Sequence, residues 1–307
     1  MQKKTLIIIA GPTAAGKTHT AVELAGYFQT EIISCDSRQI YKELSIGTAV
    51  PGISELAGIR HHFLQNKSIH RYYNASMFEN EVLELLDDLF SVKNVVIMAG
   101  GSGMYIDAVC RGIDDLPSAD NEIRQQLQNQ YQKEGIESMR ALLKRLDPEY
   151  YKTVDLRNAK RLLKALEVTL MTGKAYSSFL TNPSKKRSFD VLKIGLNIQR
   201  EALYDRINAR VDRMIQQGLA DEARRYFEFR HLNSLNTVGY KEIFRYLEGA
   251  IPLEEAIDLI KRNTRKYARR QLTWFRQYND MKWFDPSEIS EIKRYVKEYL
   301  QGKTVAI

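Results

Sequence analysis

The chain has 307 residues, of which 44% are hydrophobic and 27% charged, with a formal net charge of +8 and two cysteines. These values are typical of a soluble globular protein with one large domain or two smaller ones. They exclude a membrane protein, because no apolar run approaches the roughly 20 residues that a membrane helix needs. Cys35 and Cys110 have no metal-type spacing, and so few cysteines favour a reduced, cytoplasmic protein over a disulfide scaffold.

The first hundred residues predict alternating strands and helices. Short apolar runs at 5–10 (TLIIIA), 31–37 (EIISCDS) and 94–100 (NVVIMAG) are typical of buried parallel strands. Segments 18–28 and 76–90 between them have apolar residues at helical spacing. This order predicts the α/β class, with a doubly wound parallel sheet and right-handed crossovers.

The character of the chain changes after about residue 115. Residues 121–180 are polar and helical in pattern, and 181–188 (TNPSKKRS) form a basic segment with helix breakers. Strand character returns at 190–198 (DVLKIGLNI), and the chain is then helical to about residue 278. We therefore expect a core of residues 1–115 and 190–307, with a small helical domain inserted at 116–189.

A glycine-rich loop, GPTAAGKT, lies between the first strand and the first helix and matches the pattern G-x-x-x-x-G-K-[ST]. Its glycines allow successive backbone N–H groups to point at phosphate oxygens, and the following helix adds its N-terminal dipole. Lysine supplies a positive charge and the final threonine a hydroxyl for Mg²⁺. The expected phosphate-binding residues are Gly11, Pro12, Thr13, Ala14, Ala15, Gly16, Lys17 and Thr18.

Asp36 is the carboxylate that we expect nearest to this loop. Neighbouring parallel strands bring their carboxyl ends to one edge of a sheet, and the strand at 94–100 ends in glycines. In an NTPase or small-molecule kinase, the default class for such a loop, an acid in this place helps to hold the metal. A helix cap is the alternative role for Asp36.

The segment KRNTRKYARRQLTWFR (261–276) has seven lysines or arginines and no acidic residue. Tyr267, Trp274 and Phe275 are interleaved with these bases, as in surfaces that hold a nucleic-acid backbone. A solvated helix face would give the same pattern. Composition alone leaves both interpretations open.

Several longer runs resemble, in the same order, the motifs of the tRNA dimethylallyltransferases, also called tRNA isopentenyltransferases. They are SCDSRQIYKELSIGTAVP (34–51), RHHF (60–63), AGGSGMYIDAVCRGID (99–114), LPSAD (116–120), RLLKALEV (161–168), TVGYKE (237–242) and TRKYARRQLTWFR (264–276). The resemblance covers nearly the whole chain, and its last segment and the DSRQ stretch are far more specific than the phosphate loop. It implies transfer of a dimethylallyl group from its diphosphate to N6 of the adenosine immediately 3′ of a tRNA anticodon, with release of diphosphate.

The resemblance also implies roles for single residues. Residues 13–18 would hold the diphosphate, with Lys17 and Mg²⁺ neutralising its charge and Thr18 reaching the metal. Asp36 matches the general base near N6, and Arg206 matches an arginine placed against the diphosphate. Without the resemblance, a surface ion pair of Arg206 with a neighbouring acid would be the simpler interpretation.

A larger set matches positions that contact tRNA, and the resemblance implies that the inserted domain binds the anticodon stem-loop while the target base flips into a channel. These positions are Asp36, Ser37, Arg38, Gln39, Ser102, Arg124, Lys160, Arg161, Leu162, Leu163 and Lys164. The basic run would contact phosphates, with Trp274 and Phe275 in the core. His61 and His62 have no third ligand at suitable spacing, which favours a structural or tRNA-proximal role over a metal site. We expect a monomer.

Three rival functions share parts of this pattern. An isopentenyltransferase acting on free adenine nucleotides would need the loop and Asp36, but neither the inserted domain nor the basic run. A kinase or regulatory NTPase would need a further acceptor or switch segment. A non-catalytic RNA-binding protein would not need Thr18, Asp36 and Arg206 together.

Overall fold

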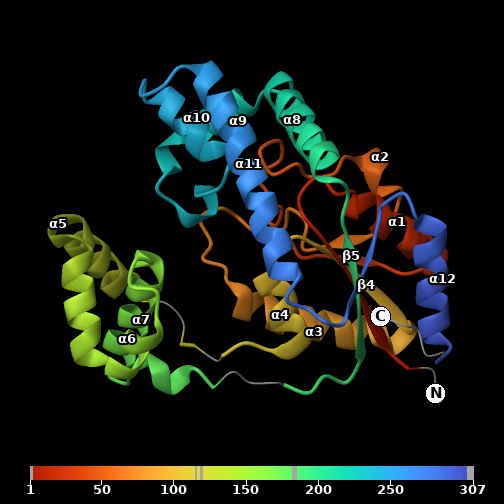
Figure 1. The fold of residues 1–307 in the computed structure, drawn as a ribbon, viewed down its shortest axis with the longest axis horizontal. Coiled ribbons are helices and arrows are strands. Elements are labelled where there is room, and N and C mark those ends of the chain that lie inside the picture. The colour runs from red at the N-terminus through yellow and green to blue at the C-terminus, as the bar shows by residue number, and fades with distance from the viewer. Residues whose placement is uncertain (1–2, 115, 118–119, 182–184, 303–307) are drawn as a thin grey trace. The chain divides into compact units, whose positions relative to one another are not determined.

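The computed structural model describes residues 3–114, 116–117, 120–181 and 185–302 of the chain, which divides into two compact units (Figure 1). The larger unit comprises Met1–Cys110 and Lys186–Ile307, and the smaller one Arg111–Lys185. The smaller unit thus begins and ends a few residues before the predicted insertion at 116–189. None of the helices in the described ranges has the length and apolarity needed to cross a bilayer.

A six-stranded parallel sheet forms the centre of the larger unit, in the order β3-β2-β4-β1-β5-β6. β1 lies between β4 and β5, with Thr5 opposite both Val95 and Asp190. The strands are β1 (Thr5–Ala10), β2 (Ile32–Ser34), β3 (His61–His62), β4 (Val95–Gly100), β5 (Asp190–Leu196) and β6 (Met281–Phe284). The predicted parallel α/β sheet is confirmed, and β2 is shorter than the predicted strand at 31–37.

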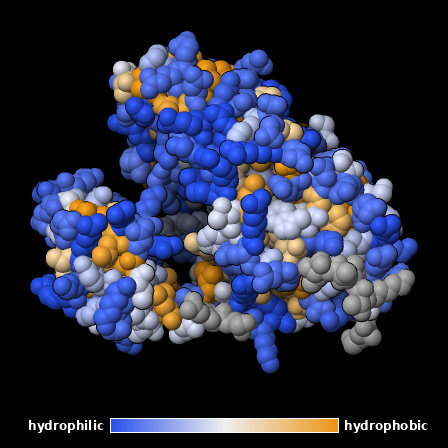
Figure 2. Space-filling model, in the orientation of Figure 1, coloured by the Kyte–Doolittle hydropathy of each residue, from blue (hydrophilic) through white to orange (hydrophobic). Residues whose placement is uncertain are grey.

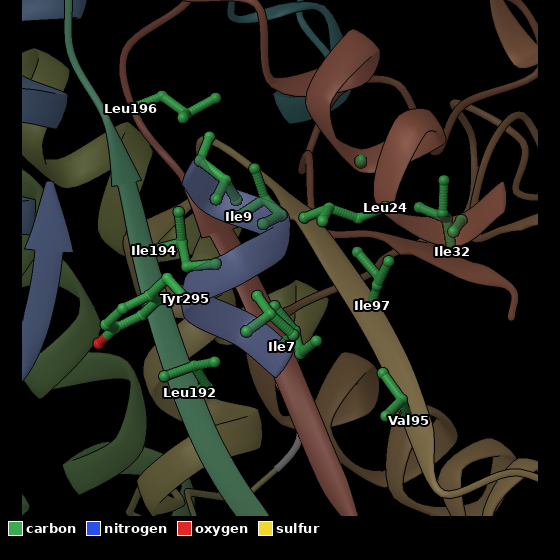
Figure 3. Close-up of a cluster of buried hydrophobic side chains, with 14 of the residues drawn as sticks. Ile7, Ile9, Leu24, Ile32, Val95, Ile97, Leu192, Ile194, Leu196 and Tyr295 are labelled. Atoms are coloured by element: carbon green, nitrogen blue, oxygen red, sulfur yellow. The ribbon is translucent and has the colours of Figure 1, made fainter. Parts of the chain in front are cut away.

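Helices cover both faces of this sheet. α1 (Lys17–Phe28) and α12 (Ile289–Leu300) pack on the face that carries Ile7 and Ile9 (Figure 3). Successive strand residues point to opposite faces, so Leu6 and Ile8 point to the other face, where they are also fully buried. α3 (Ala75–Val92) contacts β4 but contributes no residue to the apolar cluster around Ile7 and Ile9. It therefore covers the second face. The sheet is therefore doubly wound, as predicted.

The chain after β5 forms mainly helices. α8 (Arg200–Gln216) and α10 (Tyr240–Leu247) both contact the long helix α11 (Leu253–Phe275). The remaining elements of this unit are α2 (Ile53–Leu56), α4 (Gly103–Arg111, whose last residue begins the smaller unit), α9 (Leu219–Arg225) and the 3₁₀ turns Phe227–Phe229 and Asn233–Leu235.

The smaller unit has its own apolar core. It consists of α5 (Asn121–Leu146), α6 (Pro148–Thr153), α7 (Ala159–Thr172) and a 3₁₀ turn at Tyr176–Phe179. Gly135 interrupts α5 with a φ of 77°, a conformation that glycine adopts without steric cost. Met139 and Leu143 of α5 are buried in one cluster with Leu162 of α7. The visible surface of each unit is mostly hydrophilic, with small apolar patches (Figure 2).

Candidate active site

The glycine-rich loop connects β1 to α1 at the carboxyl edge of the sheet. Gly16 has a φ of 90° and directly precedes α1, which favours glycine over any residue with a side chain. A Cβ atom at Gly11 would lie 2.6 Å from the carbonyl oxygen of Leu196 at the end of β5. The backbone turn therefore requires glycine at position 16, and close packing against β5 requires glycine at position 11.

The loop and Asp36 line one cavity of about 200 Å³. Parallel pairing of β1, β4 and β2 brings their carboxyl ends together at this edge, as expected from the sequence. The cavity also contains side chains from α8 and α11, which the sheet alone did not predict. Its polar lining includes Thr13, Lys17, Thr18, Asp36, Gln39, Glu55, His61, Arg210, Tyr267 and Gln271.

Only one oxygen of the Asp36 carboxylate is held by the protein. Oδ1 accepts hydrogen bonds from the backbone N–H groups of Arg38, at 2.8 Å, and Gln39, at 3.3 Å. Oδ2 has no hydrogen-bond partner within the described ranges. Asp36 therefore caps its own turn, and its second oxygen remains able to accept a proton or bind a cation.

Two cationic side chains lie at the phosphate loop. Nζ of Lys17 donates to the carbonyl oxygen of Pro12 at 2.8 Å, and a guanidinium nitrogen of Arg210 donates to Oγ1 of Thr13 at 3.2 Å. Burial, and then the positive charge of Arg210, lower the pKa of Lys17 to about 8. Burial also lowers the pKa of Arg210. A bound anion would offset both effects, so this end of the cavity suits a phosphate group.

Arg206 does not line the cavity. It is exposed, one turn before Arg210 on α8. The sequence analysis missed Arg210. The available signal was the repetition of arginine four residues apart, which puts both side chains on one side of the helix.

Hydrogen bonds fix the Ser37–Gln39 segment to three other loops. The N–H of Ser37 donates to Oγ of Ser102 at 3.0 Å, and Arg38 donates to the carbonyl oxygens of residues 233 and 234. Nε2 of Gln39 donates to the carbonyl oxygens of Thr48 and Ala49. The structure thus brings Ser102 to the DSRQ segment and shows what orders that segment.

The predicted contact residues of the smaller unit have different environments. Lys160 and Arg161 are exposed on α7, and Leu163 is half-buried. Arg124 and Lys164 both approach the buried carboxylate of Glu167, at 3.1 and 3.5 Å. Leu162 is fully buried in the core of this unit, which corrects its assignment as an RNA contact because its side chain does not reach the surface.

Helix α11 contributes a residue that the sequence analysis did not single out. Gln271 is buried between the phosphate loop and the end of β4. Phe275 is buried as expected, whereas Trp274 is 38% exposed. Its indole N–H bonds Asp107 and the hydroxyl of Tyr278, which holds the ring at the surface and corrects the expectation of a core position.

The oxygen atoms in the cavity suit Mg²⁺ better than a softer metal. Thr18, Asp36 and Glu55 offer a hydroxyl and two carboxylates, and Mg²⁺ typically combines few protein oxygens with water and phosphate. Within the described part of the chain, no three His, Cys, Asp or Glu side chains form a metal cluster. His62 instead bonds Glu31, and Nδ1 of His61 contacts the carbonyl oxygen of Ile59.

A phosphate-type loop, two half-buried cations and a partly free carboxylate around one cavity define an enzyme of the P-loop-type α/β class. The model of the IPP transferase family matches residues 39–278, and the chain belongs to this family. It is 52% identical to tRNA dimethylallyltransferase 1 of Phocaeicola vulgatus, over 95% of this chain and 97% of that protein.

A second relative and a solved structure support this assignment. The chain is 51% identical to tRNA dimethylallyltransferase 1 of Bacteroides fragilis, over 97% of this chain and 99% of that protein. The crystal structure of the tRNA isopentenylpyrophosphate transferase of Bacillus halodurans matches with a TM-score of 0.72 and 35% identity, covering 98% of each chain. The similarity therefore extends over both compact units.

Proposed function

We propose that this chain transfers the dimethylallyl group of dimethylallyl diphosphate to N6 of an adenosine in tRNA, and releases diphosphate. One observation carries the proposal. The phosphate loop with Lys17 and Arg210, and the carboxylate of Asp36, line the same cavity. A donor with its diphosphate on the loop would present its allylic carbon to an amine that Asp36 deprotonates.

The reaction breaks the bond between the allylic carbon and the diphosphate oxygen and forms a bond between that carbon and N6. Negative charge develops on the leaving oxygen, which Lys17, Arg210 and the loop N–H groups stabilise. The amine becomes acidic as the new bond forms, and Oδ2 of Asp36 accepts its proton. Diphosphate leaves intact.

Mg²⁺ bound at Thr18, with Asp36 or Glu55 nearby, would neutralise further charge on the diphosphate. Thr18 lies at the start of α1, where the helix dipole also favours an anion. Arg206 is one turn from Arg210, and its predicted contact with diphosphate remains part of the proposal. We further propose that the chain acts as a monomer.

The tRNA would be held by charge outside the cavity. Lys266, Arg269 and Arg270 are exposed on α11 and surround a hollow next to Trp274. Exposed cations beside an aromatic ring suit phosphates and an unstacked base. Lys160 and Arg161 offer further charge on the smaller unit. We extend the proposal to the anticodon stem-loop, with the target base flipped toward Asp36, and to the cytoplasm, where tRNA is found.

Transfer of label from radioactive dimethylallyl diphosphate tests the proposal, with bulk tRNA and AMP as parallel acceptors. We expect label in tRNA only, at an adenosine next to the anticodon after nuclease digestion. Label in AMP alone would support the rival nucleotide isopentenyltransferase. Hydrolysis of ATP without label transfer would support the kinase or NTPase class.

A further inference from the structure

Glu222 on α9 is a buried carboxylate outside the proposed active site. Its Oε2 accepts hydrogen bonds from the backbone N–H groups of Ser45, at 3.1 Å, and Ile46, at 2.9 Å. Its Oε1 accepts from the N–H of Gly47, at 2.9 Å, and from the hydroxyl of Tyr240, at 2.5 Å. One side chain therefore holds three consecutive amides of a loop 175 residues or more earlier in the chain.

Tyr240 completes this attachment from α10. Its ring is fully buried, and a Cβ atom at Gly47 would lie 2.5 Å from a ring carbon. Gly47 therefore lies flat on the tyrosine ring, where any side chain would clash. Burial and the nearby charge of Glu222 raise the pKa of Tyr240, so its hydroxyl stays protonated and continues to donate. We call Glu222 and Tyr240 together the loop clasp.

The loop held by the clasp, residues 44–51, is a wall of the proposed donor site. Ser45, Ile46 and Val50 line a hollow of about 590 Å³ together with Thr18 and Arg210. Residues 48, 49 and 51 also line the smaller cavity that contains Asp36. Glu222 and Tyr240 line neither space, so they act on the wall from behind.

The same loop also positions Gln39, a polar side chain that lines the cavity with Asp36. The carbonyl oxygens of Thr48 and Ala49 accept both hydrogen bonds from Nε2 of Gln39. Ala49 has a φ of 53°, a conformation that is uncommon for a residue with a side chain. Surrounding contacts must maintain such a conformation. The amides bonded to Glu222 lie two to four residues before Ala49, so Glu222 is one of the groups that hold this part of the loop.

We propose that Glu222 is a positioning residue for the phosphorylated donor, and that Tyr240 supports it. The clasp fixes residues 44–51, so that the donor site that they line with Thr18 and Arg210 keeps its shape. Without Glu222, the three amides would lose their acceptor, and residues 44–51 could move away from the phosphate loop. This movement would weaken binding of the donor more than binding of tRNA. This inference rests on the proposed function, because the ligand is the diphosphate donor.

A graded set of variants tests the clasp. Tyr240→Phe removes one of the four hydrogen bonds to Glu222. Glu222→Gln replaces one acceptor oxygen by an NH₂ group, which would face a backbone N–H and cannot accept from it. Glu222→Ala removes all four hydrogen bonds. We expect the KM for dimethylallyl diphosphate to rise in that order, by roughly tenfold or more for Glu222→Gln. The Kd for tRNA should stay within about twofold. Amide hydrogen exchange at Ser45, Ile46 and Gly47 should accelerate in the same order.

Glu79→Gln is the matched control. Glu79 is equally buried on α3 and bonds Arg187, far in sequence from the loop. It should lower thermal stability without changing the KM for the donor. Equal KM changes in Glu79→Gln and Glu222→Gln would overturn the inference, because both would then reflect general destabilisation. A fall in kcat across the Tyr240 and Glu222 variants with an unchanged KM for the donor would also overturn the inference.

Binding of inorganic pyrophosphate with Mg²⁺, measured by calorimetry, separates this inference from the proposed function. If wild-type protein binds pyrophosphate and Glu222→Gln binds it equally well, the positioning role is wrong while the donor site stands. If wild-type protein binds no pyrophosphate, the proposed function itself fails.

Discussion

Oε1 of Gln271 on α11 accepts a hydrogen bond from the backbone N–H of Thr13 in the phosphate loop, 2.8 Å away and 258 residues earlier. Nε2 of the same side chain donates to the carbonyl oxygen of Gly101, just beyond β4, at 2.9 Å. A Cβ atom at Gly101 would lie 2.1 Å from this nitrogen. One buried carboxamide therefore joins the first loop, the end of a central strand and a late helix.

Replacing Gln271 by leucine should loosen the phosphate loop. The change keeps the side-chain size but leaves the half-buried N–H of Thr13 and the buried carbonyl of Gly101 without these partners, which costs up to about 3 kcal/mol for each group. We expect a lower melting temperature and weaker pyrophosphate binding. Gln277→Leu is the control, because Gln277 is exposed just after the same helix and should change stability by less than about 0.5 kcal/mol. Unchanged pyrophosphate binding in Gln271→Leu would show that the loop orders itself.

Replacing Asp36 by asparagine should strongly slow transfer while preserving the turn. The amide oxygen can still accept from the N–H groups of Arg38 and Gln39, but an amide does not accept a proton at neutral pH. General-base catalysis typically contributes about 10²–10⁴-fold, so we expect a fall in kcat of that size in single-turnover assays. The Kd for tRNA should stay close to wild type in filter binding. Loss of tRNA binding together with activity would assign Asp36 a structural role.

The strands that build the site were readable from the sequence because they are central. β1 and β4 are buried on both faces, so they appear as continuous apolar runs, whereas β5 includes Asp190 and Lys193 among its apolar residues. β3 and β6 have two and four residues at the sheet edges, too short to form a pattern. Helix α12 lies beyond residue 278, where the predicted helical region ended, and was not predicted. The smaller unit was recognised from its polar helical periodicity.

The site was predictable only where local sequence defines it. The glycine-rich loop and Asp36 follow strands, and the parallel topology brings them together. Arg210 and Gln271 reach the cavity because α8 and α11 pack against each other and against the phosphate loop, which no spacing reveals. Trp274 and Phe275 are adjacent, yet one is exposed and the other buried, since successive helix positions differ by about 100°.

Arg210→Ala and Arg206→Ala form a matched pair that tests which arginine contacts the diphosphate. Arg210 lines the cavity and bonds Thr13, whereas Arg206 is exposed one turn away. We expect Arg210→Ala to lower kcat/KM for dimethylallyl diphosphate by about 10²-fold or more, as for loss of a charge-stabilising group. Arg206→Ala should cost less than about tenfold. The reverse order would show that Arg206, and not Arg210, makes the main contact with the diphosphate.

The lowered pKa of Lys17 predicts how donor binding depends on pH. Its ordinary value is 10.5 and its value in the folded protein is about 8, because of burial and the charge of Arg210. Below about pH 8 the ammonium form attracts the diphosphate, and above it the neutral amine does not. Pyrophosphate affinity should therefore fall as pH rises, by about tenfold at pH 9 if binding requires the charged form. Calorimetry across pH 6.5–9.5 measures this.

Lys17→Ala provides the control and separates affinity from stability. This variant should bind pyrophosphate weakly and without the fall above pH 8. Folded wild-type protein binds fewer protons at Lys17 than the unfolded chain between about pH 8 and 10.5, so the Lys17 contribution to stability increases with pH across that window. Donor affinity and this stability contribution thus change in opposite directions. A wild-type affinity that stays constant to pH 9.5 would contradict this, because it would mean that binding takes up no proton and that Lys17 is already protonated in the free protein across this range.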